Sequence, residues 1–358
     1  MLPMRNIMKK LTKDSLSCDR TRRSFIKLCG LLGAGAAAVA VLPSERAEAL
    51  LFGKREYKVS DTRLMMGSFL SITAIHSSRD QAEHAIGLAF DEIKRLSAIF
   101  SRHDVGTPVA QLNTTGKLVN APAELLDVVT RSLQYHQLTN GSFDITTQPV
   151  VDLFKQRFAA GLTPSDTEIT DLVSRVGSKH LRMDNGSITL DREGMGITLD
   201  GIAPGYICDR VSTLLSQLGV TNHLINASGD IRTSGTSLKG KPWTVAIQDP
   251  NHQKAYPGVI TMSNGAISTS GNYEIYYDQE KMFHHIITPT TGRSPILTTS
   301  VTTTAATLMD ADALATGLMV LAPEESVHLL GNQPQFQCFI IGRDNKTTHS
   351  PGWATSLA

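Results

Sequence analysis

The sequence of 358 residues has few cysteines, few aromatic residues and almost no net charge. Four cysteines are too few for a small scaffold held together by disulfides. Residues 1–49 hold nine Lys and Arg against four Asp and Glu. Subtraction from the totals of 34 and 33 leaves 25 against 29, so the remainder carries about −4. A net acidic body gives no basic face for nucleic acid. The chain also has no P-loop, no Ser-centred hydrolase elbow and no convincing zinc motif.

The apolar stretch near the N-terminus is too short to span a bilayer comfortably. Arg22-Arg23-Ser24-Phe25-Ile26-Lys27 precedes the uncharged residues Leu28–Leu42, and Ala47-Glu48-Ala49 has the small-x-small pattern of a cleavage site. The segment resembles a twin-arginine (Tat) export signal that is removed after residue 49, and an uncleaved N-terminal anchor is the alternative. Cleavage would leave Cys208 and Cys338, whose apolar neighbours favour buried free thiols.

Hydrophobic periodicity predicts helices and strands interspersed along the rest of the chain. Helices are expected over Asp80–Phe100, Ala121–Leu138, Pro164–Val176, Gly205–Leu218 and Ala311–Leu321. Strands are expected as a pair within Val59–His76 and over Ser187–Asp191, His223–Asn226, Trp243–Gln248, Val259–Met262, Ala266–Ser268, Tyr273–Tyr277, His285–Thr288, Thr298–Ala305 and Gln337–Gly342. Helices and strands that mix without regular βαβ alternation indicate an α+β fold.

No Pro- or Ser-rich linker divides the chain after the N-terminal segment. One compact body is therefore expected over residues 50–349, followed by a frayed tail over residues 350–358.

Six segments stand out for their glycines and polar residues. They are Phe100-Ser101-Arg102-His103-Asp104 with Leu112-Asn113; Thr139-Asn140-Gly141-Ser142-Phe143-Asp144-Ile145-Thr146 with Pro149; Leu199-Asp200-Gly201-Ile202-Ala203-Pro204-Gly205-Tyr206 with Asp209; Asn226-Ala227-Ser228-Gly229-Asp230-Ile231-Arg232; His285-Ile286-Ile287-Thr288-Pro289-Thr290-Thr291-Gly292; and Asp312-Ala313-Leu314-Ala315-Thr316. Their order and spacing resemble the ApbE family of FAD:protein FMN transferases, from about Met65 to Gly342.

This resemblance implies an ApbE-like, T-fold-related architecture of mixed sheets packed with helices. It also implies FAD as substrate, Mg²⁺ as cofactor, and transfer of the FMN half of FAD to a Thr or Ser hydroxyl of a target protein with release of AMP. The expected target is a flavoprotein of a membrane-associated electron-transfer system. The expected location is the periplasm, at the outer face of the inner membrane, with no membrane span left after signal cleavage.

Asp312 and Thr316 are the candidate metal ligands. Residues four apart share one face of a helix, and a carboxylate and a hydroxyl are hard oxygen donors suited to Mg²⁺. The resemblance adds a backbone carbonyl, which here belongs to Gly201. Taken from spacing alone, Asp312 is instead expected to cap the N-terminus of its helix.

The remaining site residues are assigned through the resemblance. His285 is the catalytic candidate beside Asp312, because a neutral imidazole can orient or deprotonate the acceptor hydroxyl; a structural histidine is the alternative. FAD is expected to contact Met66, His103, Ser142, Phe143, Asp144, Thr198, Pro204 and Ile287.

Several positions depart from the family pattern. Thr198 stands where an Asp is usual, Pro204 replaces a Lys, His103 replaces an aromatic residue, and Thr288 and Thr290 replace an Asp and an Arg. These changes leave open whether transfer is abolished or altered. Two other functions therefore stay in view: an FAD-binding protein that transfers nothing, and an FAD pyrophosphatase that yields FMN and AMP.

Overall fold

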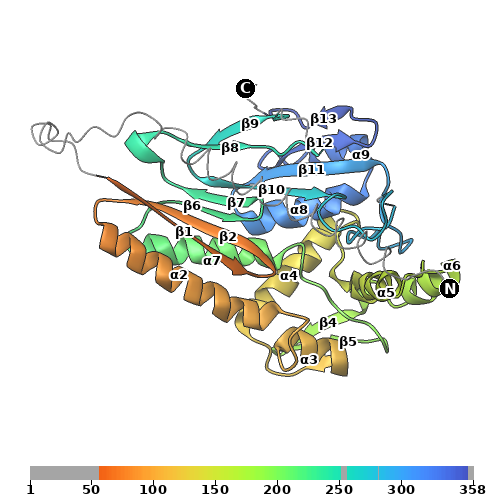
Figure 1. Ribbon diagram of the computed structural model, residues 1–358. Helices are drawn as coiled ribbons and strands as arrows, with labels where there is room; N and C mark the ends of the chain where they lie inside the picture. The colour runs from red at the N-terminus through yellow and green to blue at the C-terminus, as the bar shows by residue number, and fades with distance from the viewer. Residues whose placement is uncertain (1–55, 251–255, 281, 354–358) are drawn as a thin grey trace, which may run out of the picture. The chain divides into compact units, whose positions relative to one another are not determined.

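The computed structural model describes residues 56–250, 256–280 and 282–353. The export signal predicted over residues 1–49 lies outside these ranges. An eight-stranded sheet runs through the described part in the order β1-β2-β6-β7-β10-β11-β12-β13, with every neighbouring pair antiparallel (Figure 1). Its strands are β1 Tyr57–Met65, β2 Ser68–His76, β6 Asn222–Ala227, β7 Asp230–Ser234, β10 Gly265–Gly271, β11 Thr298–Ala305, β12 Gln337–Gly342 and β13 Thr347–His349.

Two smaller antiparallel sheets accompany the large one. The first contains β3 (Lys117–Leu118), β5 (Ser187–Leu190) and β4 (Leu181–Asp184), and the second contains β8 (Trp243–Ala246) and β9 (Val259–Met262). Valine and isoleucine side chains of β8 and β9 pack with those of β7, β10 and β12 in a small core of their own.

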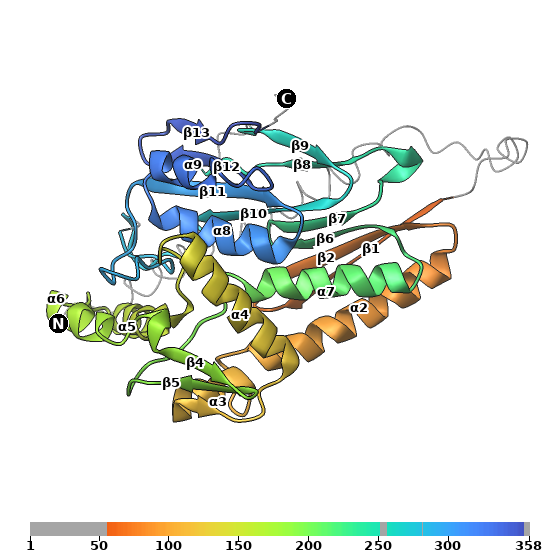
Figure 2. The same cartoon turned by 180° about the vertical axis from the view of Figure 1, so that it is seen from behind.

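Some of the helices pack against the large sheet, and the others pack against helices or the small three-stranded sheet. The helices are α2 Arg79–Phe100, α3 Pro108–Thr115, α4 Ala123–Leu138, α5 Gln148–Ala159, α6 Asp166–Val173, α7 Ala203–Gln217, α8 Leu308–Val320 and α9 Pro323–Leu330. Helix α2 contacts β1 and β2, α7 contacts β6 and β7, and α8 contacts β10 and β11 (Figures 1 and 2). The α+β architecture is as expected.

Helix α8 is buried on nearly all sides. Such an all-round apolar helix belongs in the middle of a core. It lies between β10, β11 and α7, and it is the helix that carries Asp312 and Thr316. The site is therefore built on a rigid part of the fold.

Two predicted strands are wrong. Tyr273–Tyr277 and His285–Thr288 form turns joined by a single bridge between Tyr276 and His284. Their aromatic and β-branched residues gave a strand-like pattern, but some of these side chains instead pack against α5 and α6. Local groups satisfy the backbone, since Ser294 Oγ accepts from the His284 N–H and the Arg293 carbonyl accepts from the Thr288 N–H.

The structure adds three helices that periodicity missed, namely α3, α5 and α9. Each has a proline in its first turn, at Pro108, Pro149 and Pro323. The N–H that proline lacks has no partner in the first turn of any helix, so proline is favoured there. These prolines mark helix starts rather than breaks.

The chain end expected to fray at residue 350 is packed as far as residue 353. Ser350 pairs with Cys338 through its backbone and its hydroxyl, and Trp353 stacks on Phe339. Cys208 and Cys338 are buried free thiols, as predicted. Within the residues that the structure describes, no helix combines the length and the apolar character that a membrane crossing requires.

Candidate active site

The glycine-rich turn before α7 lies against the middle of α8. At Gly201, a Cβ would stand 2.6 Å from the Thr316 hydroxyl oxygen, so only glycine allows this approach. Ser270 Oγ, from the end of β10, lies 3.4 Å from the same hydroxyl oxygen. Gly201 and Thr316, both assigned to one metal in the sequence analysis, are thus neighbours although they are far apart along the chain.

Asp312 lies one helical turn before Thr316 and faces the start of α7. Its Oδ2 accepts a hydrogen bond of 3.2 Å from the Gly205 N–H in the first turn of that helix. A Cβ at Gly205 would lie 2.6 Å from the Leu308 carbonyl oxygen, so glycine is again required by close packing. The expected cap of α8 is not Asp312, because the Thr307 side chain caps that helix.

Two buried aspartates of α8 differ in their partners. Asp310 accepts hydrogen bonds of 2.6 Å from both Tyr135 and Arg131. Asp312 is only 5 % exposed, and within the described residues it takes part in no ion pair. A buried carboxylate without a countercharge is costly. Asp312 is therefore the position in α8 that a cation would stabilise.

Burial raises the pKa of Asp312 well above its ordinary value, and the nearby carboxylate of Asp230 raises it further. Burial also raises the pKa of Asp230 to about 6, although Ser268 and the backbone of Thr269 donate to it. Two carboxylates that lie near each other in a medium of low dielectric are stabilised when one of them binds a proton or when a metal ion lies beside them. The electrostatics of the site thus call for positive charge.

The segment from Ser142 to Asp144 lies beside the same part of α8. A Cβ at Gly317 would stand 3.0 Å from the Phe143 Cβ, and Phe143 packs edge-on against Tyr135. The hydroxyl of Ser142 is buried and has no hydrogen-bond partner within the described chain. Such an unpaired polar atom, in the residue before Phe143, is suited to a polar ligand.

Asp144 is occupied inside the protein. Its carboxylate accepts from the backbone and hydroxyl of both Thr146 and Ser178, and it lies 3.3 Å from His136 Nδ1. This carboxylate therefore ties the segment to the turn before β4. Contact of this segment with FAD stays a prediction, and the geometry leaves its backbone and Ser142 for that role.

Thr198 and Pro204 flank the Gly201 turn. Thr198 donates its N–H to the Ile145 carbonyl, and its hydroxyl accepts from the Asp200 N–H. Pro204 lies in the first turn of α7. The turn is held from behind by Asn113, whose side chain both donates to the carbonyl and accepts from the N–H of Ile197. The sequence pattern alone indicates no role for Asn113.

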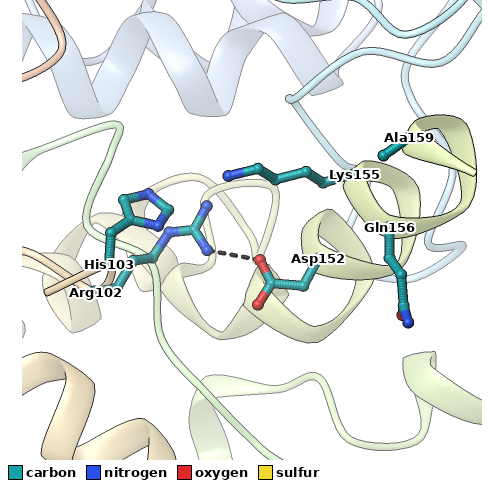
Figure 3. A pocket seen from close by; sticks show the side chains of 6 residues that line it. All are labelled: Arg102, His103, Asp152, Lys155, Gln156 and Ala159. Carbon is teal, nitrogen blue, oxygen red and sulfur yellow. Dashed lines mark hydrogen bonds and ion pairs between the residues drawn. The ribbon is translucent and has the colours of Figure 1, made fainter. Parts of the chain in front are cut away.

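His103 and Arg102 line an open hollow of about 380 Å³ against α5. Arg102 pairs with Asp152 at 2.7 Å and with Asp200 at 3.4 Å, so the hollow adjoins the Gly201 turn. In Figure 3, Lys155 extends from α5 toward the side that holds Arg102 and His103. Lys155 and Arg102 bring positive charge to the hollow, and the Asp152 carboxylate in the same lining balances part of it.

The adjacent histidines have different environments. His284 is fully buried, and burial lowers its pKa to about 4. His285 is half-buried, and its Nδ1 lies 3.0 Å from the Ile275 carbonyl oxygen. A carbonyl only accepts, so Nδ1 carries the proton and Nε2 keeps a lone pair. Burial lowers the pKa of His285, which favours this neutral form.

Two further predicted contacts lie in apolar surroundings. Met66 is half-buried, occupies the turn between β1 and β2 with φ 52°, and packs against the main core. Ile287 is 5 % exposed and packs with residues of α5 and α6. The structure explains both as core positions, and their contact with a flavin stays a prediction.

The residues present fit a magnesium ion bound with a diphosphate. Asp312 offers a carboxylate that no cation of the described residues pairs with, Thr316 a hydroxyl one turn away, and Gly201 a backbone that approaches this hydroxyl. The described residues contain no cluster of three or more His, Cys, Asp or Glu side chains that would hold a metal by themselves. A site that completes its coordination with ligand oxygens is consistent with that finding.

Two polar arrangements around this site could not be predicted from the sequence. Asp209 accepts from the N–H groups of Leu308 and Met309 at the start of α8 and pairs with Arg232. Arg102 joins Asp152 to Asp200. Both Asp209 and Arg102 lie in the segments singled out above, but their partners come from elsewhere in the chain.

Comparisons with known proteins place this geometry in context. Residues 66–340 match the model of the ApbE family. The chain is 33% identical over 250 residues to the FAD:protein FMN transferase of Klebsiella pneumoniae (strain 342), covering 62% of this chain and 71% of the relative. It is 30% identical over 290 residues to the FAD:protein FMN transferase of Haemophilus influenzae, covering 77% and 82%.

Solved structures agree with the sequence relatives. The flavin transferase ApbE from Vibrio cholerae superimposes with a TM-score of 0.71 at 26% identity, covering 84% of this chain and 98% of that one. The ApbE protein from Thermotoga maritima gives a TM-score of 0.74 at 26% identity, covering 83% and 97%. Since the family match extends over most of the chain and includes every residue of the site, this protein belongs to the ApbE family.

Proposed function

We propose that this protein is a Mg²⁺-dependent FAD:protein FMN transferase, which moves the FMN half of FAD to a Thr or Ser hydroxyl of a target protein and releases AMP. One observation carries the proposal: Asp312 is a buried carboxylate with no countercharge among the described residues, one helical turn from the Gly201–Thr316 contact. The names of the relatives supply the reaction class.

The metal site is formed by Asp312, Thr316 and the backbone of Gly201. A magnesium ion bound there supplies charge neutralisation for the diphosphate. The Gly205 N–H and the start of α7 face the same region, and a helix N-terminus favours anions. Arg102, which pairs with Asp152 and Asp200, and Lys155 in the same hollow are cationic side chains near the turn in which Pro204 replaces a lysine.

His285 is the base in this proposal. Its Nδ1 donates to the Ile275 carbonyl, so Nε2 accepts the proton of the acceptor hydroxyl. The hydroxyl oxygen forms a bond to the phosphorus on the flavin side, and the bond between that phosphorus and the bridging oxygen breaks. The electron pair leaves with AMP, so charge and atoms balance.

The location and partner follow from the N-terminal segment and the family. We propose export by the Tat pathway and action in the periplasm, on an electron-transfer protein at the outer face of the inner membrane. Tat export carries folded proteins, which is compatible with an enzyme that holds a nucleotide.

The test is incubation of the protein with FAD, Mg²⁺ and a Thr-containing target domain, followed by mass spectrometry of the target and chromatography of the nucleotides. Covalent flavin on the target with release of AMP supports transfer. Free FMN and AMP with an unmodified target would indicate a pyrophosphatase instead. FAD that is bound but unchanged would indicate a binding protein, the reading that Thr198, Pro204 and Thr288 favour.

A further inference from the structure

Helices α7 and α8 meet through three contacts in strict register. Gly201 contacts Thr316, Gly205 donates to Asp312, and Asp209 accepts from the Leu308 N–H. Each step of four residues along α7 and its preceding turn matches a step of four residues back along α8. Four residues of helix rise about 6 Å, or roughly one turn. The segments therefore run antiparallel with one contact per turn.

The first two contacts belong to the proposed metal site, and the third does not. The two oxygens of Asp209 accept separate hydrogen bonds, of 2.9 Å from the Leu308 N–H and 2.8 Å from the Met309 N–H. These donors begin α8 and have no partner within the helix. A carboxylate at this end also interacts favourably with the helix dipole.

Arg232 holds Asp209 from the sheet side. Its Nε lies 3.0 Å from Asp209 Oδ1, and its Nη1 donates to the carbonyls of Thr233 and Gly265. Asp209 is thus fixed by α7 and by β7 while it grips the first turn of α8. Rotation or sliding of α8 would break two charge-assisted hydrogen bonds at once.

We infer that Asp209 is a positioning residue for the metal site, which sets the axial position and rotation of α8 so that Asp312 and Thr316 face the Gly201 turn. The inference rests on the proposed function, because it concerns the same metal. Asp209 does not touch the metal or the nucleotide in this arrangement. It acts through Leu308 and Met309, one turn before Asp312.

The test compares Asp209→Asn with the wild-type protein in two measurements. The first is binding of Mn²⁺, followed by the loss of the free-ion electron paramagnetic resonance signal, with FAD present. The second is the Mg²⁺ concentration that gives half-maximal FMN transfer. We expect both constants to rise about tenfold, the lower end of what loss of a supporting partner around a metal costs. The transfer rate at saturating Mg²⁺ should fall less.

A matched control separates positioning from general stability. Ser165→Ala removes a side chain that accepts from a first-turn N–H of another helix, α6, which carries no residue of the site. We expect it to lower the unfolding temperature without changing Mn²⁺ binding. Asp209→Glu keeps the charge, and the variant protein should bind Mn²⁺ with intermediate affinity. This variant tests the positioning role if Asp209→Asn does not fold.

The outcomes distinguish the two proposals. Wild-type affinity for Mn²⁺ in Asp209→Asn, or in a folded Asp209→Glu when Asp209→Asn is unfolded, would overturn the positioning role. A wild-type protein that binds Mn²⁺ but transfers no FMN would overturn the proposed function alone, since the Mn²⁺ comparison still tests Asp209. A wild-type protein that binds no Mn²⁺ would overturn both.

Discussion

Gly201 and Thr316 approach so closely that a single methyl group on Gly201 would lie 2.6 Å from the Thr316 hydroxyl oxygen and 3.2 Å from its Cβ. Both distances are shorter than ordinary van der Waals contact. The chain therefore forgoes a side chain at residue 201 in order to bring backbone and hydroxyl together at the proposed metal site.

Gly201→Ala should separate this pair. We expect it to cost about 1–3 kcal/mol in the free energy of unfolding, as overpacking does, and to raise the Mg²⁺ requirement of transfer. Denaturant unfolding and a Mg²⁺ titration measure the two effects. Gly87→Ala in α2 is the control, because a Cβ there meets nothing within 4 Å. It should leave activity unchanged and gain up to about 1 kcal/mol. Equal behaviour of the two variants would contradict the close contact.

Asp312→Asn should remove metal binding while the protein stays folded. We expect transfer to fall more than about 100-fold, beyond what loss of an outer partner costs. The raised pKa of Asp312 also determines whether its contribution to stability rises or falls with pH. Because the folded state holds this proton more tightly, its contribution to stability is lost as pH rises through the folded pKa.

In metal-free protein, Asp312→Asn should therefore gain stability relative to wild type as the pH rises from 4 to 8. Thermal unfolding with EDTA and with Mg²⁺ measures this, and Mg²⁺ should stabilise only the wild type. If Asp312→Asn still transferred FMN to the target at the wild-type rate, Asp312 would not be a ligand of the metal.

His285→Gln should slow transfer by about 10²–10⁴-fold at saturating FAD, the range for loss of a general base. Because the pKa of His285 is lowered, the neutral imidazole persists below its ordinary value near 6.5, and the wild-type rate should fall only under more acid conditions. The variant should lose this acid limb in a pH–rate profile. His328→Gln, at an exposed position of α9, is the control. An unchanged profile in His285→Gln would leave this histidine a structural role.

His223 should make the fold sensitive to acid. Burial lowers its pKa to about 4, while Nε2 pairs with Ser212 and Nδ1 with the Val220 carbonyl. The unfolded chain binds this proton near pH 6.5, so stability falls as the pH drops from 7 toward 4. Between pH 7 and pH 5 the loss from this residue is about 2 kcal/mol. In His223→Gln, the difference in urea stability between the two pH values should shrink by that amount, and an unaltered difference would refute the assignment.

Asp144→Asn tests whether this carboxylate shapes the loop or contacts FAD. Loss of its charge weakens the bonds from Thr146 and Ser178, and we expect a cost of about 2–3 kcal/mol in urea unfolding. The KM for FAD should change little. Asp166→Asn, which breaks an exposed ion pair with Arg293, should cost less than about 1 kcal/mol. A large rise in KM without loss of stability would favour direct contact.

The sequence predicted the parts of this fold that depend on local patterns. The apolar periodicity of residues 80–100 matches α2, and the four-residue spacing of Asp312 and Thr316 places both on one face of α8. The order and spacing of the motifs identified the family. Glycines such as Gly201 and Gly205 make these motifs informative, because close packing allows no other residue at those positions.

The sequence could not predict relationships that depend on distant partners. Ser178, which completes the Asp144 network, lies 34 residues away, and Leu308 lies 99 residues from Asp209. Aromatic residues such as Tyr277 gave a strand-like pattern, although their contacts are with α5 in a turn-rich segment. The secondary-structure propensity of a segment does not indicate which distant element its side chains will contact.

The wide separation of Gly201 and Thr316 has a consequence during synthesis on the ribosome. They are 115 positions apart in the sequence, since 316 minus 201 is 115. At roughly 5–20 residues per second, translation reaches Thr316 roughly 6–23 s after Gly201. Throughout that interval the nascent polypeptide has the glycine turn but neither of its oxygen donors. The proposed metal site can therefore form only after the second segment has emerged and docked.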